Sequence, residues 1–355
     1  KQQRKNMKTI MKTALVVLST VALNSIAYAG ALSVSGGATA RYAAVSGTAQ
    51  SLDKGMGLTN EFTLGASGEL DNGMTWNYAM DIDPGAAGNL AYDDAQLTVT
   101  SDMGTVGWYI SEGSLGTKYA WSPSAYGAAS DTGDGFGMIY AGNISSYDNI
   151  QFHLPAGMLP AGATLKAAYS PTGSSSYSSG GSPTINHSVH DATQVQITAS
   201  PIDGLTISAD YMMSDSPTSV VQDGEDGSVG VKYSMGAVTV GYGQSYKSAA
   251  LASTTDAYAA AIDTALAGYE SIENKSYGIG FAVNDDLTLS YTIEESQPNA
   301  MTAATAAFQM EITSIQASYT MGGMSVSVSR DEADNADYVT NTEQNETLIA
   351  VSMAF

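Results

Sequence analysis

The sequence contains no cysteine, so neither disulfide bonds nor thiolate metal sites can contribute to its fold or chemistry. Basic residues are scarce, since 13 Lys and Arg stand against 35 Asp and Glu. Five of the 13 precede residue 30, which leaves eight for the rest of the chain. Nucleic-acid binding depends on Lys and Arg that neutralise phosphates. This balance therefore argues against a nucleic-acid partner and indicates a surface that collects cations.

Long apolar runs are also missing after the first thirty residues. Residues 1–29 are predicted to be an export signal, because Lys8 and Lys12 precede the apolar run 14–26 and Ala27-Tyr28-Ala29 has the small-x-small cleavage pattern. Residues 30–355 are then expected to form a single domain outside the cytoplasm. No later run reaches the roughly 18 apolar residues of a membrane-spanning helix. If this domain lies in a membrane, a closed barrel is the remaining way to satisfy its backbone.

Apolar and polar residues alternate along most of the chain, which predicts strands with one wet and one apolar face. The connections between these segments alternate between short and long. Seven short turns and eight long polar connections predict sixteen strands, a pattern typical of an outer-membrane barrel. The predicted long connections are 46–57, 83–90, 111–148, 171–191, 214–226, 247–273, 295–309 and 331–345.

The charged residues of the strand centres share the polar face, which places the apolar face toward lipid and the polar face toward the lumen. His153 also has inward parity, and we interpret it either as a hydrated wall residue or as a pH-sensitive one. Glu311 and Arg330 fall on the outward face, but near strand ends where a charge costs little. The charged residues predicted to face the lumen are Arg41, Glu61, Asp81, Lys166, Asp210, Lys232 and Glu294.

Three segments together resemble the Gram-negative general diffusion porins. They are the terminal strand 347–355 that closes on the aromatic Phe355, the hairpin 69–76, and the strand 147–155 after the longest connection. The resemblance implies an all-β fold, a sixteen-stranded antiparallel transmembrane β-barrel with short periplasmic turns and long extracellular loops, usually a homotrimer. It also implies that Phe355 is a signal to the outer-membrane assembly machinery.

The resemblance further implies that the third loop, about 111–149, folds into the pore and narrows it with acidic residues. Asp131 and Asp134 are the candidates on this loop. In the family such acids face basic residues on the wall, and charges at a constriction set selectivity. Here only Arg41, Lys166 and Lys232 clearly occupy strand positions that point into the lumen. The wall therefore offers few basic residues, and a preference for cations is expected.

Two acidic runs are candidate Ca²⁺ or Mg²⁺ sites, because hard cations prefer clustered carboxylates. Their alternative interpretation is solvated charge on surface loops, and bound divalent ions could also bridge such loops to lipopolysaccharide. Catalysis has little basis, since the chain has no cysteine and three histidines. The candidate ligands are Asp223, Glu225, Asp226, Asp331, Asp334 and Asp337.

The sequence therefore predicts a bacterial outer-membrane porin, and not an enzyme. It would carry small hydrophilic solutes and ions by passive diffusion, with a cation preference and without a cofactor. Its expected partners are outer-membrane lipid, lipopolysaccharide and two further copies of itself. Two alternatives stay open: a substrate-specific channel of the same fold, and an acidic cell-surface adhesin without a pore.

Overall fold

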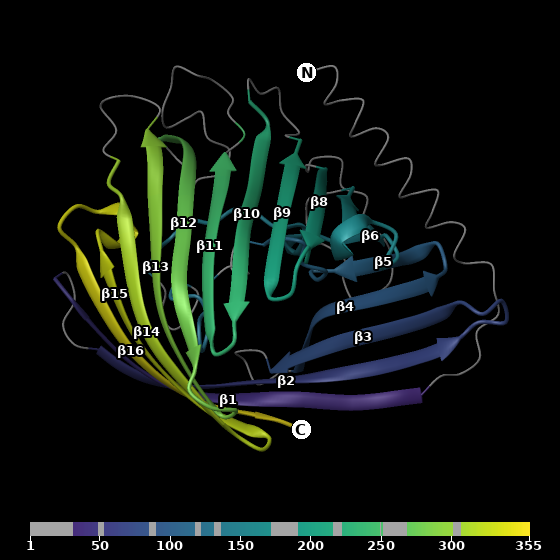
Figure 1. Ribbon diagram of the computed structural model, residues 1–355, viewed down its shortest axis with the longest axis horizontal. Coiled ribbons are helices and arrows are strands. Elements are labelled where there is room, and N and C mark those ends of the chain that lie inside the picture. Colours follow the sequence, from purple (N-terminus) through teal and green to yellow (C-terminus); the bar gives the residue numbers. More distant parts are fainter. Residues whose placement is uncertain are drawn as a thin grey trace.

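The computed structural model describes residues 31–48, 53–84, 90–117, 122–130, 136–171, 191–215, 222–248, 250, 268–300 and 307–355. Within these residues, sixteen antiparallel strands form one closed barrel in which each strand pairs with its neighbours in the chain (Figure 1). The predicted strand number and barrel fold are confirmed. None of the described helices is long and apolar enough to cross a membrane.

The strands differ in length, and the shortest, β6, follows the longest connection. The first eight are β1 (Ala31–Gly47), β2 (Asp53–Glu69), β3 (Thr75–Pro84), β4 (Leu90–Ser101), β5 (Gly104–Ile110), β6 (Asn149–His153), β7 (Thr164–Ser170) and β8 (Ala192–Ala199). The second eight are β9 (Leu205–Ser214), β10 (Gly224–Met235), β11 (Val238–Ser248), β12 (Tyr269–Ala282), β13 (Leu287–Ala300), β14 (Met310–Met321), β15 (Met324–Asp334) and β16 (Glu343–Ala354). Short 3-10 turns are η1 (Ile144–Ser146), η2 (Pro160–Gly162) and η4 (Ala336–Tyr338).

The outer face of the barrel exposes large apolar side chains at every second strand position. On neighbouring strands these include Ile279, Tyr291 and Ile315, whereas the alternate positions Thr292 and Gln316 are buried inside. A water-soluble barrel would bury its apolar side chains, so this arrangement is the inverse one expected when lipid surrounds the barrel.

Several strands continue beyond the bounds that hydrophobic alternation predicts. The first connection, predicted at 46–57, is shorter because β2 already begins at Asp53. Both acidic runs also lie partly in strands, since β10 begins at Gly224 and β15 ends at Asp334. The alternation fails there because strand ends that project beyond the hydrocarbon layer can carry polar residues on both faces.

The barrel closes at the seam between β1 and β16. Beyond the last ladder pair, the Phe355 N–H donates to the Gly36 carbonyl at 2.9 Å, and the Gly36 N–H donates to the Phe355 carbonyl at 2.8 Å. The Phe355 ring packs on Phe62 with 5.8 Å between centroids. A Cβ on Gly36 would lie 2.6 Å from the Glu61 carbonyl oxygen and 2.8 Å from the Phe355 ring. Glycine at position 36 therefore lets the terminal aromatic residue approach the wall.

Substituting Gly36 tests this seam, and Gly37 provides a matched control. Gly36→Ala should lower the midpoint of heat-induced unfolding, because overpacking costs about 1–3 kcal/mol. A Cβ on Gly37 meets its nearest neighbour, the Met353 carbonyl oxygen, at 3.4 Å, so Gly37→Ala should change the midpoint much less. The midpoints are measured from the mobility shift between heated and unheated protein on gels. Equal midpoints for the two variants would contradict this role of Gly36.

Candidate functional site: the third loop against the lumen wall

The connection between β5 and β6, residues 111–148, is the third loop and is named L3 here. Its described parts lie inside the barrel and follow one side of the wall, where the teal trace passes behind β10 to β12 in Figure 1. An outgoing arm contacts β8, β9, β13 and β14 in chain order, and a returning arm contacts β12, β10 and β8. L3 is thus a belt pressed against the wall from β8 to β14.

The outgoing arm is fastened to β9 by the carboxylate of Asp210. Its Oδ1 accepts from the Thr117 backbone N–H at 2.8 Å and from the Thr117 hydroxyl at 2.6 Å. The Ser228 hydroxyl also donates to Oδ1, and the Gln194 amide donates to Oδ2 at 3.0 Å. Asp210 retains only 6% of its accessible surface. Its charge is therefore held under L3 by four donors.

A second carboxylate, Glu294 on β13, joins both arms of L3. Its Oε1 accepts from the Ala129 backbone N–H at 3.0 Å, and its Oε2 accepts from the Ser130 hydroxyl and, at 3.2 Å, from the Tyr140 hydroxyl. Only 3% of Glu294 is exposed. Asp210 and Glu294 point inward as predicted, but the expectation that they face the open channel is wrong. They serve instead as acceptors for a loop whose N–H groups have no regular partners.

Side-chain amides also fasten the loop. Gln316 on β14 accepts from the backbone N–H groups of Tyr126 at 2.8 Å and Gly127 at 3.3 Å, and it donates to the Gly127 carbonyl at 2.8 Å. Gln194 on β8 accepts from the Ile144 N–H at 2.8 Å. An amide side chain offers both a donor and an acceptor, so it can replace a neighbouring strand as partner for irregular backbone. Alternation along the strands places both glutamines on the inner face, but their role in binding L3 was not predicted from the sequence.

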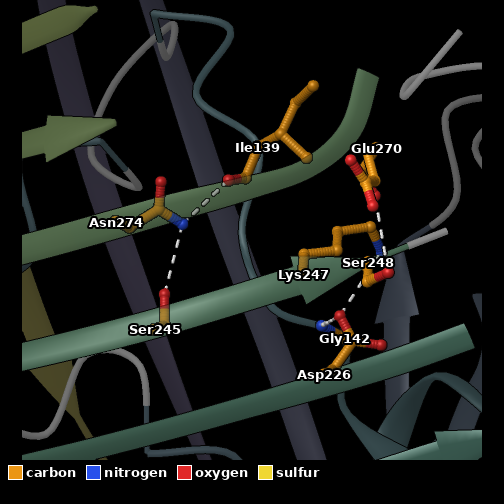
Figure 2. A network of polar contacts seen from close by, with 8 residues as sticks. All are labelled: Ile139, Gly142, Asp226, Ser245, Lys247, Ser248, Glu270 and Asn274. Atoms are coloured by element: carbon orange, nitrogen blue, oxygen red, sulfur yellow. Dashed lines mark hydrogen bonds and ion pairs between the residues drawn. The ribbon is translucent and has the colours of Figure 1, made fainter. Parts of the chain in front are cut away.

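The returning arm is bound to β10 and β12, as Figure 2 shows. The Gly142 N–H donates to Asp226 Oδ1 at 2.8 Å, and Lys247 Nζ lies 3.8 Å from the same oxygen. The Asn274 amide donates to the Ile139 carbonyl at 3.0 Å and to the Ser245 hydroxyl at 3.2 Å. Asp226, a predicted cation ligand, is therefore an anchor for L3.

The predicted divalent-cation sites do not form. Within the described part of the chain, no group of three or more Asp, Glu or His residues is placed to hold a metal ion. Successive strand residues point to opposite faces, so the inward Asp226 is separated from its neighbour Glu225. Asp331 is buried and accepts from the hydroxyls of Ser314 and Ser329. The other predicted ligands, Asp223, Asp334 and Asp337, do not form such a group with Asp226 or Asp331.

The far end of the belt is held by an apolar cluster. Phe136 of L3 is buried against Ile272, Met310 and Ile312 on the wall. Beside the cluster, the Tyr338 hydroxyl of η4 accepts from the Ile139 N–H at 2.9 Å. Burial raises the pKa of Tyr338 above its ordinary value, so this hydroxyl keeps its proton. The cluster stabilises L3 against the β12–β14 wall by removing apolar surface from water.

The remaining predicted lumen residues of the described part of the chain lie on the inner face by strand register. His153 faces Lys166 across β6 and β7, and its Nε2 lies 2.7 Å from the Gln151 amide oxygen. Asp131 and Asp134, the predicted constriction acids, lie outside the described residues. The other inner-face residues are Arg41 opposite Gly57, Glu61 opposite Gly37, Asp81 opposite Thr63, and Lys232 opposite Gly241.

A closed barrel with an apolar outer face and an inward-folded third loop agrees with the family comparison. The sequence profile described as Gram-negative porin matches residues 13–353. The chain belongs to the Gram-negative porin family. No curated protein sequence matches it significantly.

Solved porin structures share the fold at low sequence identity. Salmonella typhi OmpF, in a complex with daunomycin, superposes with a TM-score of 0.64 at 13% identity, covering 92% of this chain and 98% of that one. An anion-selective porin from Comamonas acidovorans gives 0.62 at 11% identity, covering 92% and 100%. The trimer form of Vibrio cholerae OmpT gives 0.58 at 12% identity, covering 92% and 100%.

Removing the Glu294 anchor should loosen L3. In Glu294→Ala the three donors from Ala129, Ser130 and Tyr140 lose their acceptor, and each buried donor left unpaired costs about 1–3 kcal/mol. We expect increased current noise and altered conductance in single-channel recordings. Asp81→Ala is the matched control for current noise, because it removes one carboxylate from a wall strand outside the belt. Equally low current noise in the two variants would contradict the role of Glu294 in holding the loop.

Proposed function

We propose that this porin is a passive channel for small hydrophilic solutes and ions, with a preference for cations. The observation that carries the proposal is the distribution of charge around L3. The belt takes up the wall from β8 to β14, so the water-filled passage is bounded by the free side of L3 and by the strands opposite it. Passage through such a lumen needs no covalent step and no cofactor.

The cation preference follows from how few basic groups face this passage. Arg41, Lys166 and Lys232 lie on the inner face. The ammonium group of Lys247 lies close to the Asp226 carboxylate. Arg330 is on the outer face, where its guanidinium donates to the Thr347 hydroxyl. Glu61 and Asp81 supply negative charge on β2 and β3. Charged side chains that line a pore favour ions of opposite sign. The Comamonas porin shares the fold and is described as anion-selective, so the fold alone does not determine the sign, and we assign it to these wall charges.

Planar-bilayer recording in a salt gradient tests this proposal. We expect ohmic channels whose reversal potential indicates cation preference, a stronger preference in Arg41→Ala, and a weaker one in Asp81→Asn. A reversal potential of the opposite sign would contradict the selectivity. Block by micromolar amounts of one solute would indicate a substrate-specific channel, and no conductance would contradict the channel itself.

We further infer that the protein is a homotrimer that contacts its copies through the outer face of β1 and β2. Ala38 and Ala40 occupy successive outward positions of β1, and their small side chains allow another barrel to approach closely. Leu32 and Leu58 beside them are strongly exposed. One related structure is described as a trimer form. We also infer that residues 1–29 are a cleaved leader, and that the assembly machinery recognises Phe355.

A bulky side chain at this face should separate the subunits. Ala40→Trp is expected to shift the protein from trimer to monomer on unheated gels and after crosslinking, because the indole would hold neighbouring barrels apart. Val328→Trp places the same side chain on the outer face of β15 and should leave the trimer intact. Unchanged assembly of both variants would place the interface elsewhere on the barrel.

A further inference from the structure

A small cavity separates L3 from the wall at β11 to β13, close to the residues drawn in Figure 2. It lies between the outgoing and returning arms of the loop, and both arms contribute to it. Its inward polar side chains are those of Ser122 and Tyr140 from L3, Ser245 from β11, Asn274 and Ser276 from β12, and Glu294 from β13. Gln244 and Lys275 also border it, but they occupy the alternate strand positions, whose side chains point to the outer face.

Three buried polar atoms of this lining have no hydrogen-bond partner among the described residues. They are Asn274 Oδ1, Ser122 Oγ and Ser276 Oγ. An unpaired buried polar group is expensive, and native proteins leave few of them. Three in the lining of one small cavity point to a ligand that they share.

The orientation of the Asn274 side chain is determined by its partner. The Ile139 carbonyl can only accept, so the Asn274 nitrogen must face it, and the amide oxygen lies on the other side of the amide, as Figure 2 shows. Asn274 is 4% exposed. Its oxygen is therefore a buried acceptor, so the ligand must carry a proton donor or a positive charge.

The charge of Glu294 favours a positive ligand. Each of its contacts comes from a donor, namely the Ala129 N–H and the hydroxyls of Ser130 and Tyr140, as a carboxylate requires. Among the described residues, no ammonium or guanidinium group pairs with this carboxylate. A buried charge ordinarily has a charged partner or coordinates an ion. A single water molecule would satisfy the hydroxyls, whereas a cation would also place a positive charge beside this carboxylate, which its three neutral donors do not supply.

We propose that this cavity binds one monovalent metal cation, K⁺ or Na⁺, behind the third loop. Its ligands are the oxygens of Asn274, Ser122, Ser276 and Glu294, and hard cations prefer oxygen ligands of this kind. One carboxylate balances one positive charge, whereas a divalent ion would require more acidic ligands. The ion connects the outgoing arm of L3 to the wall beside the point where Glu294 holds both arms, so occupancy stabilises the belt.

Crystals of the intact protein grown in rubidium chloride test the site directly. Rubidium scatters anomalously, and we expect an anomalous peak within coordination distance of Asn274 Oδ1 and Glu294. Density without an anomalous signal would show a water molecule only, and would overturn the proposal, as would an empty cavity. This result is independent of the channel's selectivity, which the reversal potential measures separately.

A second experiment uses the two hydroxyls that have no described partner. The heat-unfolding midpoint should be higher in potassium chloride than in choline chloride of equal concentration, because a ligand that binds only the folded state stabilises it. Ser122→Ala combined with Ser276→Ala should remove most of this difference. The matched control is Ser318→Ala with Ser327→Ala, a pair bonded to each other at 2.9 Å, and it should keep the difference. No salt difference in the wild type, or an unchanged one in the first double variant, would contradict the site.

Discussion

In its described parts, L3 has no regular secondary structure beyond one 3-10 turn, so its backbone must find hydrogen-bond partners on the wall. Side chains of β8 to β14 supply these partners. Asp210, Glu294 and Gln316 each accept from backbone N–H groups of L3, and Gln316 also donates to a carbonyl. These residue types are therefore required by the loop as much as by the barrel, and the position of L3 in the lumen depends on them.

This requirement divides the acidic residues of the lumen into two groups. Asp210, Asp226 and Glu294 are buried and act as acceptors for L3, so water and solutes in the passage have little contact with them. Glu61 and Asp81 lie on β2 and β3, outside the belt. Because L3 covers these three carboxylates, the net charge of the chain overstates the number of acidic groups that a solute can contact. In the proposed channel, selectivity therefore depends on a few residues of the strands opposite L3.

The strand number and the two faces of the barrel could be predicted because lipid imposes strict alternation along each strand. The ends of the strands could not, since alternation is lost beyond the membrane and the acidic residues near Asp226 and Asp331 resemble a loop there. The alternation of side chains along the strands also predicted that Asp210 and Glu294 point into the barrel. It could not show that L3 covers them, because their partners Thr117 and Ala129 lie 93 and 165 residues away in the sequence.

Different residues hold L3 in place and supply charge to the opposite wall. A change on β8 to β14 acts through L3, because it alters the acceptors that hold the loop, and so changes the shape of the passage. A change at Arg41, Glu61 or Asp81 leaves those acceptors in place and alters the field directly. If selectivity is set as proposed, substitutions on β1 to β3 change the ion preference of this porin while L3 stays bound. The structures of an anion-selective porin and of this acidic chain agree in fold at 11% identity, as such independence would allow.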